Sequence, residues 1–351
     1  ANGLAGYIHV VKEDPKEPNL IYAGSELGVY ASFDRGMTWT DLRLGLPRLA
    51  VVDLVVHPRD NDLVIATHAR GFYILDDITP LQHIAAGRVA AAAPALFPPI
   101  AAVRYVPASD TSVLGNRVWV APNQPYGAIL NYYLPEAAPG GVTFQVIDRG
   151  GRTVSTFTGP GAKGVNRTNW NLSEVSQCGP PPPGRGPGRG GRPGGGTWIR
   201  SIPGDYSVRL TAPGTSVEHR VTVRRDPRLP ATTSDMNVWY GLAQKIEKTE
   251  CTLDRAAADL ADVERQIAAR PSDATTETLR RDLRPVVLAL RGDPKDPGHV
   301  NLPARLNWLT IQVGNNSHAP TAAQMEWIGK YADQAAEAIS RLEEIKARLR
   351  K

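Results

Sequence analysis

The feature that most constrains the fold is an internal repeat near the N-terminus. The stretch NLIYAGSELGVYASFD, which starts at Asn19, aligns with DLVIATHARGFYILDD, which starts at Asp62, at an offset of 43 residues. A period of about 40–50 residues is typical of a four-stranded propeller blade. Each copy alternates strand-like apolar runs with turn residues, so we expect two blade repeats within residues 1–80. The matched pairs are Leu20 with Leu63, Ala23 with Ala66, Gly28 with Gly71 and Tyr30 with Tyr73.

The first copy ends in SFDRGMTW, residues 32–39, which joins a hydroxyl, a carboxylate, a glycine and an indole in one short turn. Asp34 can accept hydrogen bonds from backbone N–H groups of its own turn. Gly36 can supply a positive φ, and Trp39 can bury a large ring between neighbouring sheets. This chemistry favours a turn that holds the fold together over a catalytic constellation.

The same turn carries a resemblance to a known family. Ser32, Asp34, Gly36, Thr38 and Trp39 match every defining position of the Asp-box, Ser-x-Asp-x-Gly-x-Thr-Trp. The chain therefore resembles sialidase-like and sortilin-type (BNR repeat) β-propellers. In that family the hairpin lies on the outer rim, away from the central site, so the resemblance implies a structural role.

The second copy lacks this motif. Asp77 and Thr79 stand where the first copy has its carboxylate and glycine, and a proline-rich stretch follows. The second copy is therefore predicted to be a terminal blade. Because a closed propeller needs at least about four blades, we expect an incomplete propeller whose missing blades lie upstream or whose sheets pack on another surface.

Residues 81–104 are rich in alanine and proline, which predicts a stiff linker. Residues 105–228 hold short apolar runs separated by Gly, Pro and Asn turns, which predicts an immunoglobulin-like β-sandwich. Its stretches PGDYSVRLTAPG and NRTNWNL resemble the immunoglobulin-like domain of flagellar hook-capping proteins and many bacterial propeller proteins. Tyr132, Tyr133 and Trp170 are better candidates for the sandwich core than for platforms on which a glycan stacks.

Residues 233–351 repeat apolar side chains at intervals of three and four, which predicts a helical hairpin or bundle. Ser234-Asp235 and Pro320-Thr321 are candidate helix starts. The stretch LPARLNWLTIQVGNNSHAPTAAQMEWI resembles the C-terminal helical tail of large bacterial sortilin-like, Asp-box repeat proteins. The order of units also matches that family: final blades, immunoglobulin-like domain, helical tail.

One insertion interrupts the predicted sandwich. Residues 178–196, CGPPPPGRGPGRGGRPGGG, offer no core residue, so we expect a disordered loop that is dispensable for folding. It is either a tolerated surface loop or a candidate interaction loop, in which an acidic partner or lipid headgroups would contact Arg185, Arg189 and Arg192.

Cys178 and Cys251 are the only cysteines, too few for a zinc cluster. They can pair in an oxidising compartment, although no spacing requires it.

No catalytic, cofactor-binding or metal-binding residue is predicted. His9, His57 and His68 lack metal-ligand spacing, and no glycine-rich phosphate loop opens a helix. A sialidase needs an arginine cluster, a Tyr/Glu nucleophile pair and an acidic Asp, and that family's Phe/Tyr-Arg-Ile-Pro motif is absent. Glu26, His68 and Arg70 could face a central cavity, but we favour the interpretation that they are ordinary polar residues of surface loops.

Charge and hydropathy exclude two further classes of function. The formal net charge of +5 is concentrated in the Pro/Gly/Arg loop, so it does not predict a nucleic-acid groove. The most apolar run, residues 89–103, contains three prolines and is too short to span a membrane. The chain begins with Ala1 rather than Met, which suggests a processed chain or a fragment.

These observations favour a non-catalytic, extracytoplasmic bacterial scaffold or protein-interaction protein, such as an accessory subunit of a larger, membrane-associated complex. The alternative is the C-terminal portion of a secreted glycan-binding or sialidase-like, glycoside-hydrolase-like propeller protein. Under both hypotheses the partner is another protein or the remaining propeller blades. Two repeats alone leave apolar strands uncovered, and such surfaces and edges invite association.

Overall fold

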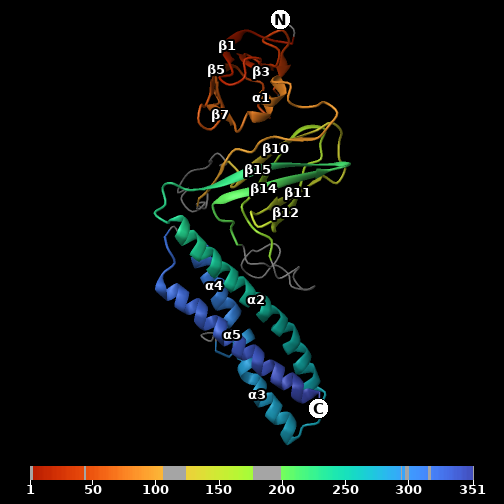
Figure 1. The fold of residues 1–351 in the computed structure, drawn as a ribbon, viewed down its shortest axis with the longest axis vertical. Coiled ribbons are helices and arrows are strands. Elements are labelled where there is room, and N and C mark those ends of the chain that lie inside the picture. The colour runs from red at the N-terminus through yellow and green to blue at the C-terminus, as the bar shows by residue number, and fades with distance from the viewer. Residues whose placement is uncertain are drawn as a thin grey trace. The chain divides into compact units, whose positions relative to one another are not determined.

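The computed structural model describes residues 3–42, 45–105, 124–176, 199–293, 295–296, 300–314 and 318–350. The fold is mixed β plus α, with several sheets followed by a C-terminal helical region (Figure 1). The chain divides into two compact units. The first comprises residues 1–103, 109–171 and 204–224, and the second comprises residues 104–108, 172–203 and 225–351.

The two sequence repeats form two antiparallel sheets in the first unit. The first sheet has the order β1-β2-β3-β4, and the second has the order β5-β6-β7. The strands of the first sheet are β1 (Ile8–Glu13), β2 (Ile21–Ser25), β3 (Gly28–Ser32) and β4 (Thr40–Asp41). Those of the second are β5 (Val51–Val56), β6 (Leu63–Thr67) and β7 (Phe72–Leu75).

The strand pairing shows that the sequence alignment of the two repeats is wrong by one residue in β2 and β6, the second strand of each copy. The row Lys12–Tyr22–Ala31 of the first sheet corresponds to the row Val55–Val64–Ile74 of the second. The outer strands keep the offset of the sequence alignment, whereas β6 is one residue closer to the N-terminus. The hairpin loops explain the shift. Ser25 pairs directly with Gly28 across a two-residue turn, but β6 and β7 are joined by a longer loop in which Ala69 has φ 74°.

A one-residue shift moves every side chain of a strand to the other face, so the faces are assigned from these rows. We define the front face of the first sheet by Val10, Tyr22, Val29 and Ala31, and its back face by Val11, Ala23 and Tyr30. In the second sheet the front face consists of Val55, Val64, Phe72 and Ile74, and the back face includes Leu54, Leu63, Ile65 and Tyr73.

The two sheets pack front to back. One hydrophobic cluster joins the front face of the first sheet to the back face of the second. Gly24 lies directly against β5: a Cβ atom there would lie 2.7 Å from a methyl group of Val51 and 2.8 Å from its carbonyl oxygen. Equivalent faces therefore do not meet, and the arrangement is a head-to-tail stack of two repeats.

Residues 81–104, which were predicted to be a linker, contribute regular structure to the first unit. Helix α1 (Thr79–Ala85) follows β7, and β8 (Ala95–Leu96) and β9 (Ala102–Arg104) join two further sheets. Leu96, Phe97 and Ala102 are buried, so short apolar pieces between the prolines are sufficient to form edge strands.

Those two sheets contain the strands that the structure describes between residues 124 and 225. One has the order β13-β10-β8, and the other has the order β12-β11-β14-β15-β9. Their cores include Trp170 packed edge-on against Tyr206, and Tyr132 packed edge-on against Phe144, whereas Tyr133 is half-buried. The strands are β10 (Ala128–Leu134), β11 (Val142–Ile147), β12 (Thr153–Gly159), β13 (Gly164–Trp170), β14 (Gly204–Ala212) and β15 (Thr215–Arg225).

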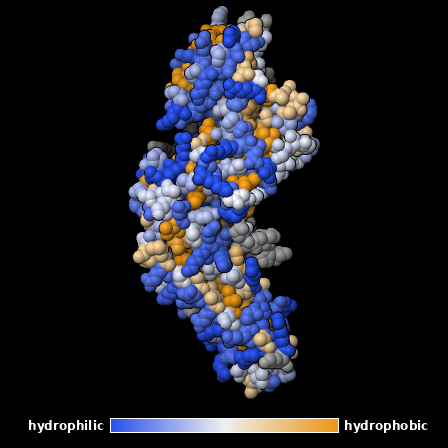
Figure 2. Space-filling view, in the orientation of Figure 1, coloured by the Kyte–Doolittle hydropathy of each residue, from blue (hydrophilic) through white to orange (hydrophobic). Residues whose placement is uncertain are grey.

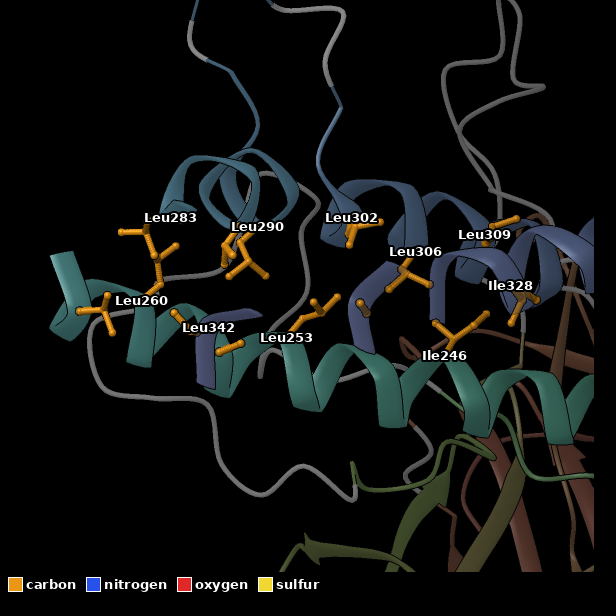
Figure 3. Packing of buried hydrophobic residues seen from close by; sticks show 14 of the residues in the cluster. Ile246, Leu253, Leu260, Leu283, Leu290, Leu302, Leu306, Leu309, Ile328 and Leu342 are labelled. Atoms are coloured by element: carbon orange, nitrogen blue, oxygen red, sulfur yellow. The ribbon is translucent and has the colours of Figure 1, made fainter. Parts of the chain in front are cut away.

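The predicted C-terminal helical region is confirmed in the second unit. Thr232 and Asp235 form a capping box at the start of α2, and Thr321 and Gln324 form another at the start of α5. Leucines from α2, α3 and α4 point toward one another in the core, together with Ile328 and Leu342 of α5 (Figure 3). The helices are α2 (Thr233–Ala268), α3 (Ala274–Arg291), α4 (Leu302–Gly314) and α5 (Ala322–Leu349). None of the described helices is long and apolar enough to cross a membrane.

Candidate functional site

The turn at residues 32–39 is a closed hydrogen-bond network. Asp34 accepts hydrogen bonds from the backbone N–H of Thr38 at 2.8 Å, from the Thr38 hydroxyl at 2.5 Å and from the Ser32 hydroxyl at 2.8 Å. Ser32 Oγ in turn accepts from the N–H of Gly36 at 2.7 Å. The predicted positive φ of Gly36 is confirmed at 88°. Trp39 donates a hydrogen bond from Nε1 to the Gly36 carbonyl. Its ring is half-buried and does not belong to the hydrophobic cluster that joins the two sheets.

This geometry leaves the carboxylate of Asp34 committed to its own turn. The hydrogen bonds from Thr38, followed by that from Ser32, hold the pKa of Asp34 below its usual range. A general acid needs a carboxyl group that stays protonated near neutral pH, which is the opposite shift. The chemistry available here is therefore the stabilisation of a turn.

A buried polar cluster locks the two repeats together beside α1. The Asp14 carboxylate accepts from Tyr22 Oη at 3.0 Å, from Gln82 Nε2 at 3.0 Å and from the backbone N–H groups of Lys16 and Glu17. Gln82 exchanges hydrogen bonds with the Asn61 side chain, which also accepts from Lys16 Nζ at 2.8 Å. Burial, reinforced by the Asp14 carboxylate, raises the pKa of Tyr22 far above its usual range. These groups satisfy one another, which indicates a structural clamp.

A second polar cluster connects the repeats to strands β10 and β13. Asp77, buried and at φ 52°, accepts from Asn131 Nδ2 at 2.7 Å and from the N–H of Thr79. Asn131 accepts from Arg167, whose guanidinium also reaches the Asp76 carbonyl. Burial raises the pKa of both Asp62 and Asp76 above the usual range of an aspartate. In the part of the chain that the structure describes, no group of three or more His, Cys, Asp or Glu residues could hold a metal ion.

The front face of the second sheet is the candidate interaction surface, which we call the open face. Val55, Phe72 and Ile74 are 49%, 75% and 60% exposed, and the half-buried Val64 lies between Val55 and Ile74 in one cross-strand row. In the first sheet, Val29 and Ala31 occupy the rows of Phe72 and Ile74 and are 1% and 0% exposed. Figure 2 shows hydrophobic residues at the surface of the N-terminal sheets.

The open face ends at an unpaired strand edge. In the first sheet β4 pairs with β3 through Tyr30 and Ala31, but no described strand pairs with the outer edge of β7. Sheet edges of this kind present free backbone donors and acceptors to another chain. An apolar face beside an open edge is suited to binding another sheet.

The polar residues weighed for a central cavity do not converge on a site. Glu26 lies in the exposed turn between β2 and β3, whereas His68 and Arg70 lie in the exposed loop between β6 and β7. His57 is half-buried and accepts from the N–H of Asp60 at 3.2 Å within its own turn. His9 is exposed on β1.

The candidate interaction loop lies outside the described residues, and so do Arg185, Arg189, Arg192 and Cys178. Cys251 of α2 is engaged in a disulfide bond, and the chain contains one other cysteine, Cys178.

The Asp14 and Asp77 clusters were not predicted from the sequence. A proline-flanked Asp14 and an Asn61 in the matching turn of the second repeat are signals, but their contacts with Gln82 arise only after the two repeats stack.

Comparison with known proteins assigns no family. No protein-family model matches the chain, and no curated protein sequence matches it. A solved structure described as "Biofilm associated protein - BSP domain" is similar at 9% identity and a TM-score of 0.19, over 65% of this chain and 26% of that one. The chain thus spans about a quarter of the length of that protein, and so low a TM-score carries no argument about fold or function.

Proposed function

We propose that the chain is a non-catalytic protein-interaction module of an extracytoplasmic scaffold, built from the end of an Asp-box propeller, an immunoglobulin-like sandwich and a helical tail. The observation that carries the proposal is the open face: Phe72 and Ile74 are exposed where the first repeat buries Val29 and Ala31, and Val55 is exposed beside them. The polar clusters favour a structural role, because their carboxylates are satisfied by neighbouring side chains and backbone amides.

The partner is another sheet of the same repeat type. Within this chain, a front face is covered by a back face that presents Leu54, Leu63 and Ile65. A sheet with such a back face would bury the open face in the same head-to-tail manner. Head-to-tail contacts are heterologous, so they join a series of repeats, in one chain or several.

The extracytoplasmic location is supported by the disulfide bond of Cys251. Disulfides persist in oxidising compartments and are rare in the reducing cytosol. Thiol labelling of the protein freshly extracted from its native cells tests this point. Reactive thiols in that protein would contradict the proposed location.

Light scattering coupled to size-exclusion chromatography tests the interaction. The purified chain should self-associate through its open face and the β1 side of the first sheet's back face, where Val11 is 56% exposed while Ala23 and Tyr30 in the same row are already buried. Ile74→Asp should abolish association, because a charge would be buried in the contact. Val11→Asp should also abolish it, whereas an equimolar mixture of the two variants should form dimers and nothing larger.

Val165→Asp is the matched control, since Val165 is a 49% exposed valine on β13, outside both faces. It should leave association unchanged. A stable wild-type monomer that binds no hydrophobic dye would contradict the proposal, and so would equal loss of association in all three variants.

A further inference from the structure

The helical unit contains a groove that the scaffold proposal does not use. It is bounded by α3, α4 and α5 and encloses about 340 Å³. Sites for small molecules occupy roughly 300–1,000 Å³, so this volume suits a small ligand at the lower end of that range. It is too small to seat an amphipathic helix, whose diameter with side chains is about 10–12 Å.

The floor and one wall of the groove are apolar. Val286, Leu302 and Ala338 are buried and form the floor, while Pro285 and Leu288 of α3 line one side. Pro285 lies inside the helix, where it cannot donate a backbone N–H. This side of the groove therefore offers hydrocarbon surface to a ligand and few hydrogen bonds.

The opposite rim is polar and carries an excess of positive charge. Gln334, Glu337 and Arg341 follow one another at helical spacing along α5, and Arg305 of α4 completes the rim. Arg341 is neutralised by Glu337, with 2.6 Å between Nη2 and Oε1.

Arg305 is the cation that remains. Its guanidinium carbon lies 5.6 Å from the centre of the Tyr331 ring, which holds the side chain in place. No carboxylate of the described residues forms an ion pair with it. A half-buried arginine beside an apolar floor is suited to a ligand carboxylate, because guanidinium and carboxylate form strong charge-assisted hydrogen bonds.

We propose that this groove binds a small amphipathic carboxylate with an unbranched apolar tail of medium length. The guanidinium of Arg305 and the side-chain amide of Gln334 bind the carboxylate. The tail packs along Pro285, Leu288 and Val300, an exposed valine that precedes α4 and also lines the groove. A neutral alcohol with the same tail retains the apolar contacts but loses the charge-assisted bonds. An alkylammonium ion meets the positive rim and is disfavoured.

Isothermal titration of the full chain tests the site, with decanoate and decylammonium below their critical micelle concentrations and decanol below its solubility limit. Decanoate should bind with one-to-one stoichiometry and the highest affinity. Arg305→Gln should weaken decanoate binding about 10-fold or more, the effect expected for a lost charge-assisted hydrogen bond, and should leave decanol binding unchanged. Ala289→Leu, which fills part of the groove, should weaken binding of both ligands.

Arg348→Gln is the matched control, because Arg348 is an exposed arginine of the same helical unit, on α5, that pairs with Asp282 and does not line the groove. It should leave decanoate affinity unchanged, and thermal melts of every variant should match the wild type. The proposal is overturned if decanoate does not bind, if decanoate and decanol bind equally, or if Arg305→Gln and Arg348→Gln behave alike. None of these results depends on the open face of the second sheet.

Discussion

The two N-terminal sheets are copies of one pattern, yet one front face is buried and the other is exposed. The rows of the first sheet carry Tyr22, Val29 and Ala31, and the same rows of the second carry Val64, Phe72 and Ile74. The first set packs on the neighbouring sheet, whereas Phe72 and Ile74 are open to solvent. Apart from Lys12 on the first and Asp53 on the second, both faces are apolar, so hydrophobicity alone does not decide which of them is buried.

The two faces differ in how closely the backbone of a neighbouring strand can approach them. Gly24 in the first sheet permits backbone-close contact with Val51, and the second sheet has Ala66 in that row. The first sheet also gains a fourth strand from the chain after its Asp34 turn, whereas the chain after Asp77 turns into α1. In the described part of the chain, no further sheet covers the front face of the second repeat, and Phe72 and Ile74 stay exposed there.

The largest expected effect concerns Asp14 and His57, which hold the same position in the two repeats. Asp14→Ala should lower the free energy of unfolding by on the order of 3 kcal/mol, because the buried Tyr22 hydroxyl would lose its acceptor and Gln82 would keep only the Asn61 oxygen. His57→Ala should lower the free energy of unfolding by under about 1 kcal/mol, since the half-buried imidazole gives up only its hydrogen bond from the N–H of Asp60. Denaturant titration followed by circular dichroism measures both, and equal losses would show that the cluster does not clamp the repeats.

A smaller loss is expected at Asp34. Asp34→Ala should lower the Tm by about 4 °C, because the turn amide of Thr38 loses its acceptor. The folded pKa lies below the unfolded one, so this stabilisation is present above about pH 4 and is lost as the pH falls through the folded pKa. The difference in Tm between variant and wild type should therefore shrink in acid. An unchanged Tm together with lost partner binding would overturn the structural role of the turn.

The smallest effect, with the opposite sign, is expected at Asp62 of the second repeat. Burial raises the folded pKa of Asp62 above its unfolded value, so its negative charge destabilises the fold at neutral pH. Asp62→Asn keeps an oxygen to accept from the N–H of Asp77 and should raise the Tm at pH 7 by about 2 °C. The gain should diminish as the pH falls through the raised pKa. A lower Tm at pH 7 would show that the ionised carboxylate is needed in this cluster.

Local sequence determined the elements of the fold and the chemistry of one turn. Alternating apolar residues marked the strands around Tyr22, Tyr132 and Trp170, and apolar residues at intervals of three and four marked the C-terminal helices. The positive φ of Gly36 also followed from its residue type. Such features depend on neighbours close in the chain, which is why they can be recognised before any packing is known.

Only the tertiary structure decided the register of β6, the inclusion of Ala95–Leu96 and Ala102–Arg104 in sheets and the exposure of Phe72 and Ile74. The register depends on the lengths of two loops, and the apolar sequence of β6 accepts either face. The Asp14 cluster and the groove beside Arg305 join residues that are distant in sequence. Periodicity identifies which side chains share a face, but the element that covers that face is chosen by non-local packing.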